Sequence, residues 1–419
     1  MRRLGLFVLA MVLVLSWSKV ATRQADYNEI RQASGLVTNI VKKKRSTNYY
    51  MGNLLAVDFS GKDRGVHIGD RVRVYGKSSN LDDMVFKDFD YGRHLRSKGI
   101  DSYIQVSGVE IYARSGLYSK LGRLKDYCIG ANKDMYKRYG DILNSLVLGY
   151  RDDLDQDVRV NFRDAGVSHV MAISGLHISI VVAIFLVVFG KVNRLERLFF
   201  LFISLMLYNI LVGGGPSITR AIGLTIIGAM AYFVDRRLDI INVLGLVASI
   251  MILFNPYTIY NVSFQLSFLA VLSIAIYSKY LKKYLYFNFL NTCIAANILT
   301  IPLVLYNFKT FSTVGIIGNI LVLPFIGLVI FLDMVSLVAY CLSIDLALLV
   351  AYINEAILRS VYYFLERLAN YGVYNIEVRH VSPVFLLVYY GLALGLAIFL
   401  EIYYIRVNRT YKLENNKEN

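Results

Sequence analysis

Residues 160–190 read VNFRDAGVSHVMAISGLHISIVVAIFLVVFG and separate a polar front half of the chain from an apolar back half. The stretch from Val167 to Phe189 contains no Lys, Arg, Asp or Glu. One helix needs about 20 such residues to cross the hydrocarbon core of a bilayer. We therefore expect a membrane-spanning helix here, with a water-facing region before it and a membrane domain after it.

The first half of this predicted helix is unusually polar, because it contains His169, Ser174, Gly175 and His177. Polar groups in a bilayer are costly unless they have partners or line a wet cavity. In one interpretation the serine hydroxyls bond to helix carbonyls and the histidines lie near the interface. In the other, the helix breaks at Ser174-Gly175 and faces an aqueous path, as discontinuous helices do in transporters.

The same residues also raise the questions of catalysis and metal binding. Ser174 and His177 share a helix face, as a nucleophile and its base would, but no acid close in sequence is available to orient the histidine. His169 and His177 are separated by about 12 Å along a helix, which is too far to bind one ion together. We therefore expect no catalytic residues, no metal and no cofactor.

The composition is that of an integral membrane protein. Of the 419 residues, 56% are hydrophobic and only 18% are charged, and the mean hydropathy is +0.49. These values exclude an ordinary soluble enzyme. The formal net charge of +15 suits nucleic acid and anionic lipid. Because cytoplasmic loops of membrane proteins are themselves enriched in Lys and Arg, the charge alone does not establish DNA binding.

The part of the chain before the junction divides into three segments. Residues 1–24 place Arg2 and Arg3 before an apolar run, as in a signal peptide or a retained anchor, and we favour a membrane anchor with a cytoplasmic N-terminus. Residues 25–115 alternate short apolar segments with glycine-containing turns, which predicts a small closed β-barrel of the OB type. Residues 116–160 predict amphipathic helices, lying on the membrane surface or linking to the β domain.

Basic and aromatic residues on the predicted β domain are candidates for contacts with DNA. A loop of this composition would hold phosphates with its cations and stack bases on its rings. The alternative is a solvated hairpin tip. The candidate residues are Lys42, Lys43, Lys44, Arg45, Tyr49 and Tyr50, and a second basic cluster runs from Arg93 to Lys98.

The apolar stretches predict a polytopic α-helical membrane protein of about ten spans, with the membrane domain at 161–405 and a polar tail at 406–419. Basic residues recur at 191–197, 235–237 and 279–283 and after Arg406, on alternate connections. All lie on the cytoplasmic side if Arg2 and Arg3 do. The β domain, 213–216 and 255–256 then lie on the extracytoplasmic side of the cytoplasmic membrane.

Polar residues inside the predicted spans are further candidates for a transport path, since ionisable groups at membrane depth usually face a bundle interior or water. Arg220 lies near the outer end of a span, where it can also snorkel. Asp333 must be neutral, paired or wet, and an ion pair with Arg220 is one hypothesis. The two other candidates are Gln265 and Asn319, the latter near Pro324, which either opens a pore-lining break or makes a packed kink.

Another polar stripe lies on the predicted helix at 345–365, where Glu355, Arg359 and Glu366 share one face. The stripe lines a channel if the helix crosses the membrane. It faces head groups and water if the helix is interfacial, and the C-terminus then changes side.

FRDAGVSHVMAISGLHISIVVAI resembles the signature of the ComEC family of bacterial competence proteins. LGYRDDLDQDVRVNFRDAG, GPSITRA, NPYTIYNVSFQLSFLAVL and GNILVLPF resemble other segments of its membrane domain, in the family's order, and GDRVRVYGK with FKDFDYGRHLRSKGIDSYIQV resembles its OB-like domain. The resemblance implies a channel that imports single-stranded DNA during natural transformation. It also implies membrane lipids, a DNA receptor outside and a DNA-translocating ATPase inside as partners, and it leaves a homo-oligomer open.

The chain departs from many ComEC proteins in one respect. Those proteins carry a metallo-β-lactamase-like nuclease domain with an HxHxDH-type motif, whereas no two of the five histidines here form H-x-H. We therefore expect a channel and not an enzyme. The competing hypotheses are a transporter or scaffold for another anionic polymer or lipid-linked substrate, and a membrane hydrolase built on Ser174 and His177.

Overall fold

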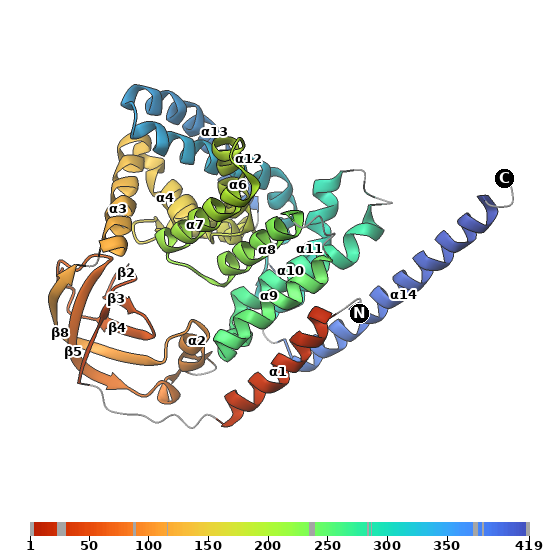
Figure 1. Ribbon diagram of the computed structural model, residues 1–419, viewed down its shortest axis with the longest axis horizontal. Helices are drawn as coiled ribbons and strands as arrows, with labels where there is room; N and C mark the ends of the chain where they lie inside the picture. The colour runs from red at the N-terminus through yellow and green to blue at the C-terminus, as the bar shows by residue number, and fades with distance from the viewer. Residues whose placement is uncertain are drawn as a thin grey trace.

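The computed structural model describes residues 4–22, 31–86, 89–114, 116–233, 239–282, 285, 287–371, 376–378 and 381–415. Figure 1 shows a β domain at one end of the molecule, a body of helices beside it, and a long C-terminal helix that projects from this body. Several residues used above to predict the topology lie outside the described residues, namely Arg2, Arg3, 235–237 and Lys283.

The β domain is built on a six-stranded sheet in the order β1-β5-β8-β4-β3-β2. All neighbouring strands are antiparallel except β4 and β8, which are parallel. The edge strands β1 and β2 are joined by Val37 and Thr38, whose N–H groups donate to Asp70 O and Tyr50 O at 2.9 and 2.8 Å. The sheet thus closes on itself through one bent segment. Its strands are β1 (Gln32–Leu36), β2 (Asn39–Lys43), β3 (Ser46–Met51), β4 (Leu54–Asp58), β5 (Asp70–Ser79) and β8 (Ser102–Arg114).

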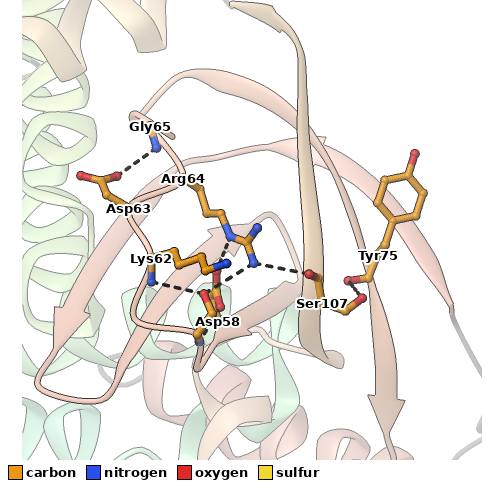
Figure 2. A network of polar contacts seen from close by, with 8 residues as sticks. Asp58, Lys62, Asp63, Arg64, Gly65, Tyr75 and Ser107 are labelled. Carbon is orange, nitrogen blue, oxygen red and sulfur yellow. Dashed lines mark hydrogen bonds and ion pairs between the residues drawn. The ribbon is translucent and has the colours of Figure 1, made fainter.

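Alternate residues of these strands fill the interior, as the period of two in the sequence predicts. Val72, Val74 and Ile104 have 0% of their surface exposed. The loop between β4 and β5 is tied to β8, because Arg64 donates from Nε to Asp58 Oδ2 at 2.8 Å and from Nη2 to the Ser107 carbonyl at 3.3 Å (Figure 2). The charge of Arg64 is therefore neutralised within the domain.

Short elements fill the connection between β5 and β8, and longer helices follow the β domain. The connection contains η1 (Leu81–Asp83), β6 (Val85–Phe86), β7 (Phe89–Asp90) and α2 (Tyr91–Ser97). The helices before the junction are α1 (Leu4–Thr22), α3 (Gly116–Tyr136), η2 (Lys137–Tyr139), α4 (Gly140–Leu148) and α5 (Gln156–Asp164). The elements from the junction onward are η3 (Ser168–Met171), α6 (Gly175–Phe189), α7 (Arg194–Val212), α8 (Pro216–Phe233), α9 (Ile240–Phe254), η4 (Pro256–Tyr260), α10 (Val262–Leu281), α11 (Asn288–Phe308), β9 (Thr310–Phe311), α12 (Gly315–Tyr340), α13 (Ile344–Tyr371), β10 (Ile376–Glu377) and α14 (Pro383–Asn415).

Five helices in the described part of the chain are long and apolar enough to cross a membrane: α7, α10, α11, α12 and residues 383–403 of α14. Three shorter apolar helices accompany them at 8–17, 175–189 and 240–254. The chain is therefore a largely helical membrane protein with an N-terminal β domain. The expected number of about ten membrane spans stays a prediction. Residues 344–371 form the amphipathic helix α13, on which Arg359 Nη2 lies 3.3 Å from Glu355 Oε1 within the predicted polar stripe.

Helices α3, α4 and α5 belong to the same hydrophobic core as α12 and α13. Leu143, Phe162, Ile326 and Leu365 are each fully buried in this core. The first turns of α3 also touch the β domain, since a Cβ at Gly69 would lie 2.2 Å from Ser119 N. The segment 116–160 therefore packs between the β domain and the last helices of the body.

The junction is not one continuous helix from Val167 to Phe189, so that expectation is wrong. The η3 turn ends at Met171, the chain is extended at Ala172 and Ser174, and α6 begins at Gly175. Ser174 and His177 form a capping box at the start of α6. The Ser174 side chain accepts a backbone N–H of the first turn, and the His177 ring accepts the backbone N–H of Ser174. The break at Ser174-Gly175 is thus present, and we call residues 172–174 the α6 break.

The β domain contacts the helical body at two loops that were predicted to lie on its side of the membrane. Asn255 Nδ2 donates to the Arg96 carbonyl of α2 at 2.8 Å. A Cβ at Gly213 would lie 3.0 Å from Asn39 Nδ2 of β2. The three glycines before α8 all have positive φ, which residues with a Cβ rarely adopt. The values are 85° at Gly213, 70° at Gly214 and 140° at Gly215.

Candidate functional site

His177 is a fully buried side chain that joins α6 to the end of α4. Its Nε2 lies 2.6 Å from the Leu146 carbonyl oxygen, and its Nδ1 accepts the Ser174 N–H at 3.1 Å. Since Nδ1 accepts, Nε2 carries the hydrogen and donates it to Leu146. Tyr208 of α7 donates to the neighbouring Val147 carbonyl at 3.2 Å. The last carbonyls of a helix need such partners where no water reaches them.

This arrangement does not favour a nucleophilic serine. Ser174 Oγ lies 3.4 Å from His177 Nδ1, but that nitrogen is already engaged by a backbone N–H. The other ring nitrogen faces a carbonyl and no carboxylate, so nothing in the site would stabilise an imidazolium. The Ser174 hydroxyl oxygen instead accepts the Leu176 N–H at 3.3 Å and acts as a helix cap.

Arg220, on the second turn of α8, lies against the start of α6. Its side chain is 8% exposed, and its Nε is buried without a partner. A Cβ at Gly175 would lie 3.9 Å from Arg220 Nη2, so the guanidinium faces the first residue of α6. No carboxylate in the described part of the chain pairs with Arg220. The positive end of the α6 dipole and an unpaired cation thus meet at the α6 break, and both favour an anion.

The chain just before the α6 break is bonded by a residue from outside the predicted membrane domain, and Gly166 within that domain packs closely on α12. Arg151 donates from Nη2 to the Met171 carbonyl, just before the break. Gly166 has a φ of 72°, and a Cβ there would lie 2.4 Å from the Cα of Gly315 in α12. Arg151 stands in no local motif that would indicate this role, because its acceptor is a backbone carbonyl 20 residues away.

The remaining predicted path residues are placed separately. His169 is exposed on η3, and Asn319 is half-buried on α12 with its Oδ1 unpartnered. Gln265 donates from Nε2 to the Ile259 carbonyl at 2.7 Å, next to the β domain, and so closes the connection between η4 and α10. The structure therefore brings Ser174, Gly175, His177 and Arg220 together, and leaves Gln265 outside this group.

Asp333 does not pair with Arg220 among the described ion pairs. Its side chain is fully buried, and its Oδ2 accepts a hydrogen bond of 3.3 Å from Asn132 Nδ2 of α3. The ion pair hypothesised from the sequence is thus replaced by contact with an amide from the region before the junction. The partner was not predictable, because it lies 201 residues away in the chain.

The basic residues from Lys42 to Arg45, which we call the basic hairpin, are exposed at the turn between β2 and β3. Tyr49 behind them is not available to stack on bases as predicted, whereas Tyr50 is half-buried. Tyr49 is 3% exposed inside the barrel, where burial, with smaller contributions from Asp58 and Asp63, raises its pKa to about 12. Tyr50 packs against the buried cluster around Leu55.

The basic hairpin faces the helical body. The Lys42 N–H donates to Asp152 Oδ2, in the loop after α4, at 2.7 Å. Lys43 interacts with Lys98 of the second basic cluster, and burial together with this like charge lowers the pKa of Lys98. The two basic clusters therefore meet on the surface of the β domain that adjoins the loops before α5 and α8.

Comparison with known proteins places these features in a family. The competence protein family model matches residues 146–402, which is more than half of the chain. The chain belongs to the competence protein family. A relative from Bacillus subtilis (strain 168), ComE operon protein 3, is 25% identical over 319 residues, which cover 72% of this chain and 40% of the relative. An uncharacterized protein from Aquifex aeolicus (strain VF5) is 30% identical over 128 residues, covering 30% of each chain. No solved structure matches.

The competence match contains the α6 break, Arg220, Asn319 and Asp333, whereas the β domain and α3 precede it. The chain spans 40% of the length of the B. subtilis relative and 30% of that of the A. aeolicus relative. Within the residues that the structure describes, no three His, Cys, Asp or Glu side chains are grouped to hold a metal ion.

Proposed function

We propose that this competence protein conducts single-stranded DNA across the bacterial cytoplasmic membrane, with the strand passing the α6 break. The observation that carries the proposal is the buried, unpaired Arg220 beside the first residue of α6. In a competence protein, the anion that meets Arg220 would be the phosphate backbone of DNA. A strand crossing a bilayer needs cations of this kind along its path, because charges in hydrocarbon are costly without partners.

The β domain would receive the strand before it reaches Arg220. A closed sheet in which a bent first strand bonds to both edges is typical of an OB-like barrel, a fold that binds single strands in basic grooves. The basic hairpin meets Lys98 on the surface next to α8, and β2 touches Gly213, seven residues before Arg220. Basic residues thus lie on the part of the β domain that adjoins the chain leading to Arg220.

The orientation and partners follow from the same proposal. The β domain would lie outside the cytoplasmic membrane, where a DNA receptor delivers the strand. An ATPase on the inner side would pull the strand, because the chain contains no GxxxxGK[ST] phosphate loop. Membrane lipids surround the helices, and a homo-oligomer would place several such paths side by side.

The direct test is uptake of labelled DNA into protease- and nuclease-protected cytoplasm, in wild type, a deletion strain, and the deletion complemented with the intact gene. We expect uptake to be lost on deletion and restored by complementation. Unchanged uptake in the deletion strain would contradict the proposal and would favour another anionic polymer as the cargo.

Charge reversal at the basic hairpin is expected to weaken DNA binding by the full-length protein. We predict that Lys43→Glu with Lys44→Glu lowers the affinity for a labelled single strand roughly tenfold. The plot of log affinity against log salt concentration should also become less steep, by about one unit of slope for each phosphate contact that is lost. The matched control reverses Arg71 and Lys77, which are exposed on β5, a strand that pairs with neither β2 nor β3. A larger loss in that control, measured by fluorescence anisotropy in nanodiscs, would move the DNA to the β5 face.

A further inference from the structure

A cluster of polar side chains is buried inside the hydrophobic core that α3 and α4 share with α12 and α13. Each member is at most 1% exposed, although the surrounding residues are apolar. Polar side chains in such surroundings require complete hydrogen bonding to be tolerated. We call the following set the buried polar cluster: Asn132 and Tyr136 of α3, Asn144 of α4, Asp333 and Ser336 of α12, and Asn354 of α13.

Hydrogen bonds connect the cluster across all four helices. Asn132 Nδ2 donates to Asp333 Oδ2 at 3.3 Å and to Asn144 Oδ1 at 3.1 Å. Asn354 Nδ2 donates to the Tyr136 hydroxyl at 3.1 Å, and that hydroxyl lies 2.9 Å from Ser336 Oγ. The cluster therefore joins the α3–α4 pair to the α12–α13 pair.

Three atoms of the cluster remain without a hydrogen-bond partner: Asp333 Oδ1, Asn132 Oδ1 and Asn354 Oδ1. All three are acceptors when the acid is ionised, so what the cluster lacks is a hydrogen to donate. No lysine or arginine among the described ion pairs compensates Asp333. An isolated carboxylate buried in an apolar core costs far more than a neutral acid, and such a group takes up a proton instead.

We propose that Asp333 is a proton-binding site, whose bound proton holds α12 and α13 against α3 and α4. One proton on Oδ1 converts an unpartnered acceptor into a donor, and the amide oxygens of Asn132 and Asn354 are the free acceptors of the same cluster. The proton comes from water and returns to it, and no other bond is made or broken except these hydrogen bonds. The site is independent of the cargo.

Few other titratable groups act on this site. From α3, Tyr136 and Cys128 interact with Asp333. From α4 and α13 the groups that face the cluster are the amides of Asn144 and Asn354, which do not titrate. α12 itself contributes only the Ser336 hydroxyl, which donates to the Asp333 carbonyl at 2.9 Å. The protonation of Asp333 is therefore governed by its own burial and by the neutral groups around it.

Loss of the proton would leave an uncompensated charge between the two helix pairs. The start of α3 touches the β domain at Ser119, and the end of α3 carries Asn132 and Tyr136. Deprotonation would thus loosen the helix that connects the β domain to the body.

The test uses the full-length protein in lipid nanodiscs, with Asp333→Asn as the mimic of the neutral acid. We expect wild type to show the infrared carbonyl band of a protonated carboxyl at neutral pH, and the Asn variant to lack it. We also expect wild type to lose thermal stability as pH rises, since the folded state holds a proton that the unfolded chain releases, by up to about tenfold in the unfolding equilibrium per pH unit. The Asn variant should not show this part of the pH dependence.

The matched control is Asp345→Asn, an exposed acid at the start of α13, which should keep both the band and the pH dependence of wild type. The proposal is overturned if the Asp333 band is absent. It is equally overturned if Asp333→Asn fails to fold or is less stable than wild type at every pH, because the ionised carboxylate would then be the form that the fold requires.

Discussion

Replacing Arg220 by glutamine is expected to reduce DNA uptake roughly 10- to 100-fold at an unchanged protein level, which corresponds to the loss of about 1.5–3 kcal/mol from one charge-assisted contact. The guanidinium is buried, has no carboxylate partner in the described chain, and faces the first residue of α6. Because no acid among the described residues neutralises it, its removal takes positive charge from the proposed path without freeing a described buried acid. Uptake of labelled DNA into nuclease-protected cytoplasm measures the effect.

Two further variants show whether the charge or the fold is responsible. Arg220→Lys should retain part of the uptake, since it keeps the cation and loses the planar donor pattern. Arg197→Gln is the matched control, because Arg197 donates to the Gly190 carbonyl at the opposite end of α6. Uptake at wild-type levels in Arg220→Gln would remove this residue from the path, and an equal loss in Arg197→Gln would point to general damage to the bundle.

His177→Ala is expected to destabilise the protein by about 3 kcal/mol, because it leaves one buried and one partly buried backbone group without partners. These groups are the Leu146 carbonyl, which His177 Nε2 now meets at 2.6 Å, and the Ser174 N–H, which donates to Nδ1 at 3.1 Å. We predict a lower level of folded protein in the membrane and a lower thermal midpoint in detergent. Uptake should fall in proportion to the folded protein that remains.

Serine variants on the same helix calibrate this result. Ser174→Ala removes only the cap of α6 and should cost about 1 kcal/mol with uptake retained. Ser179→Ala removes an exposed hydroxyl that bonds the Gly175 carbonyl at 3.0 Å and should be nearly neutral. Loss of function in a stable Ser174→Ala protein would instead revive the hydrolase hypothesis. A stable His177→Ala protein without uptake would give His177 a direct role in transport.

Local sequence patterns predicted the features that depend on neighbouring residues. The polar residues at the start of the junction left two interpretations open, and the structure has the one with a break at Ser174-Gly175, where a capping box lies. The alternation in residues 25–115 predicted the strands, because side chains of a strand alternate between the interior and solvent. The prediction that Tyr49 is exposed was wrong. Which of two alternating side chains points into the barrel depends on how the strands pair, and the sequence does not show that pairing.

What the sequence by itself determined is the class of molecule: an apolar helical body and a preceding β domain. These follow from composition and short periodicities, which act within a few residues. Only the tertiary structure decided which polar groups meet. Asp333 meets Asn132 from 201 residues away and not Arg220, and His177 meets the Leu146 carbonyl from 31 residues away. Such partners are chosen by the packing of whole helices, because a buried donor or acceptor bonds whatever the fold brings within 3 Å or so.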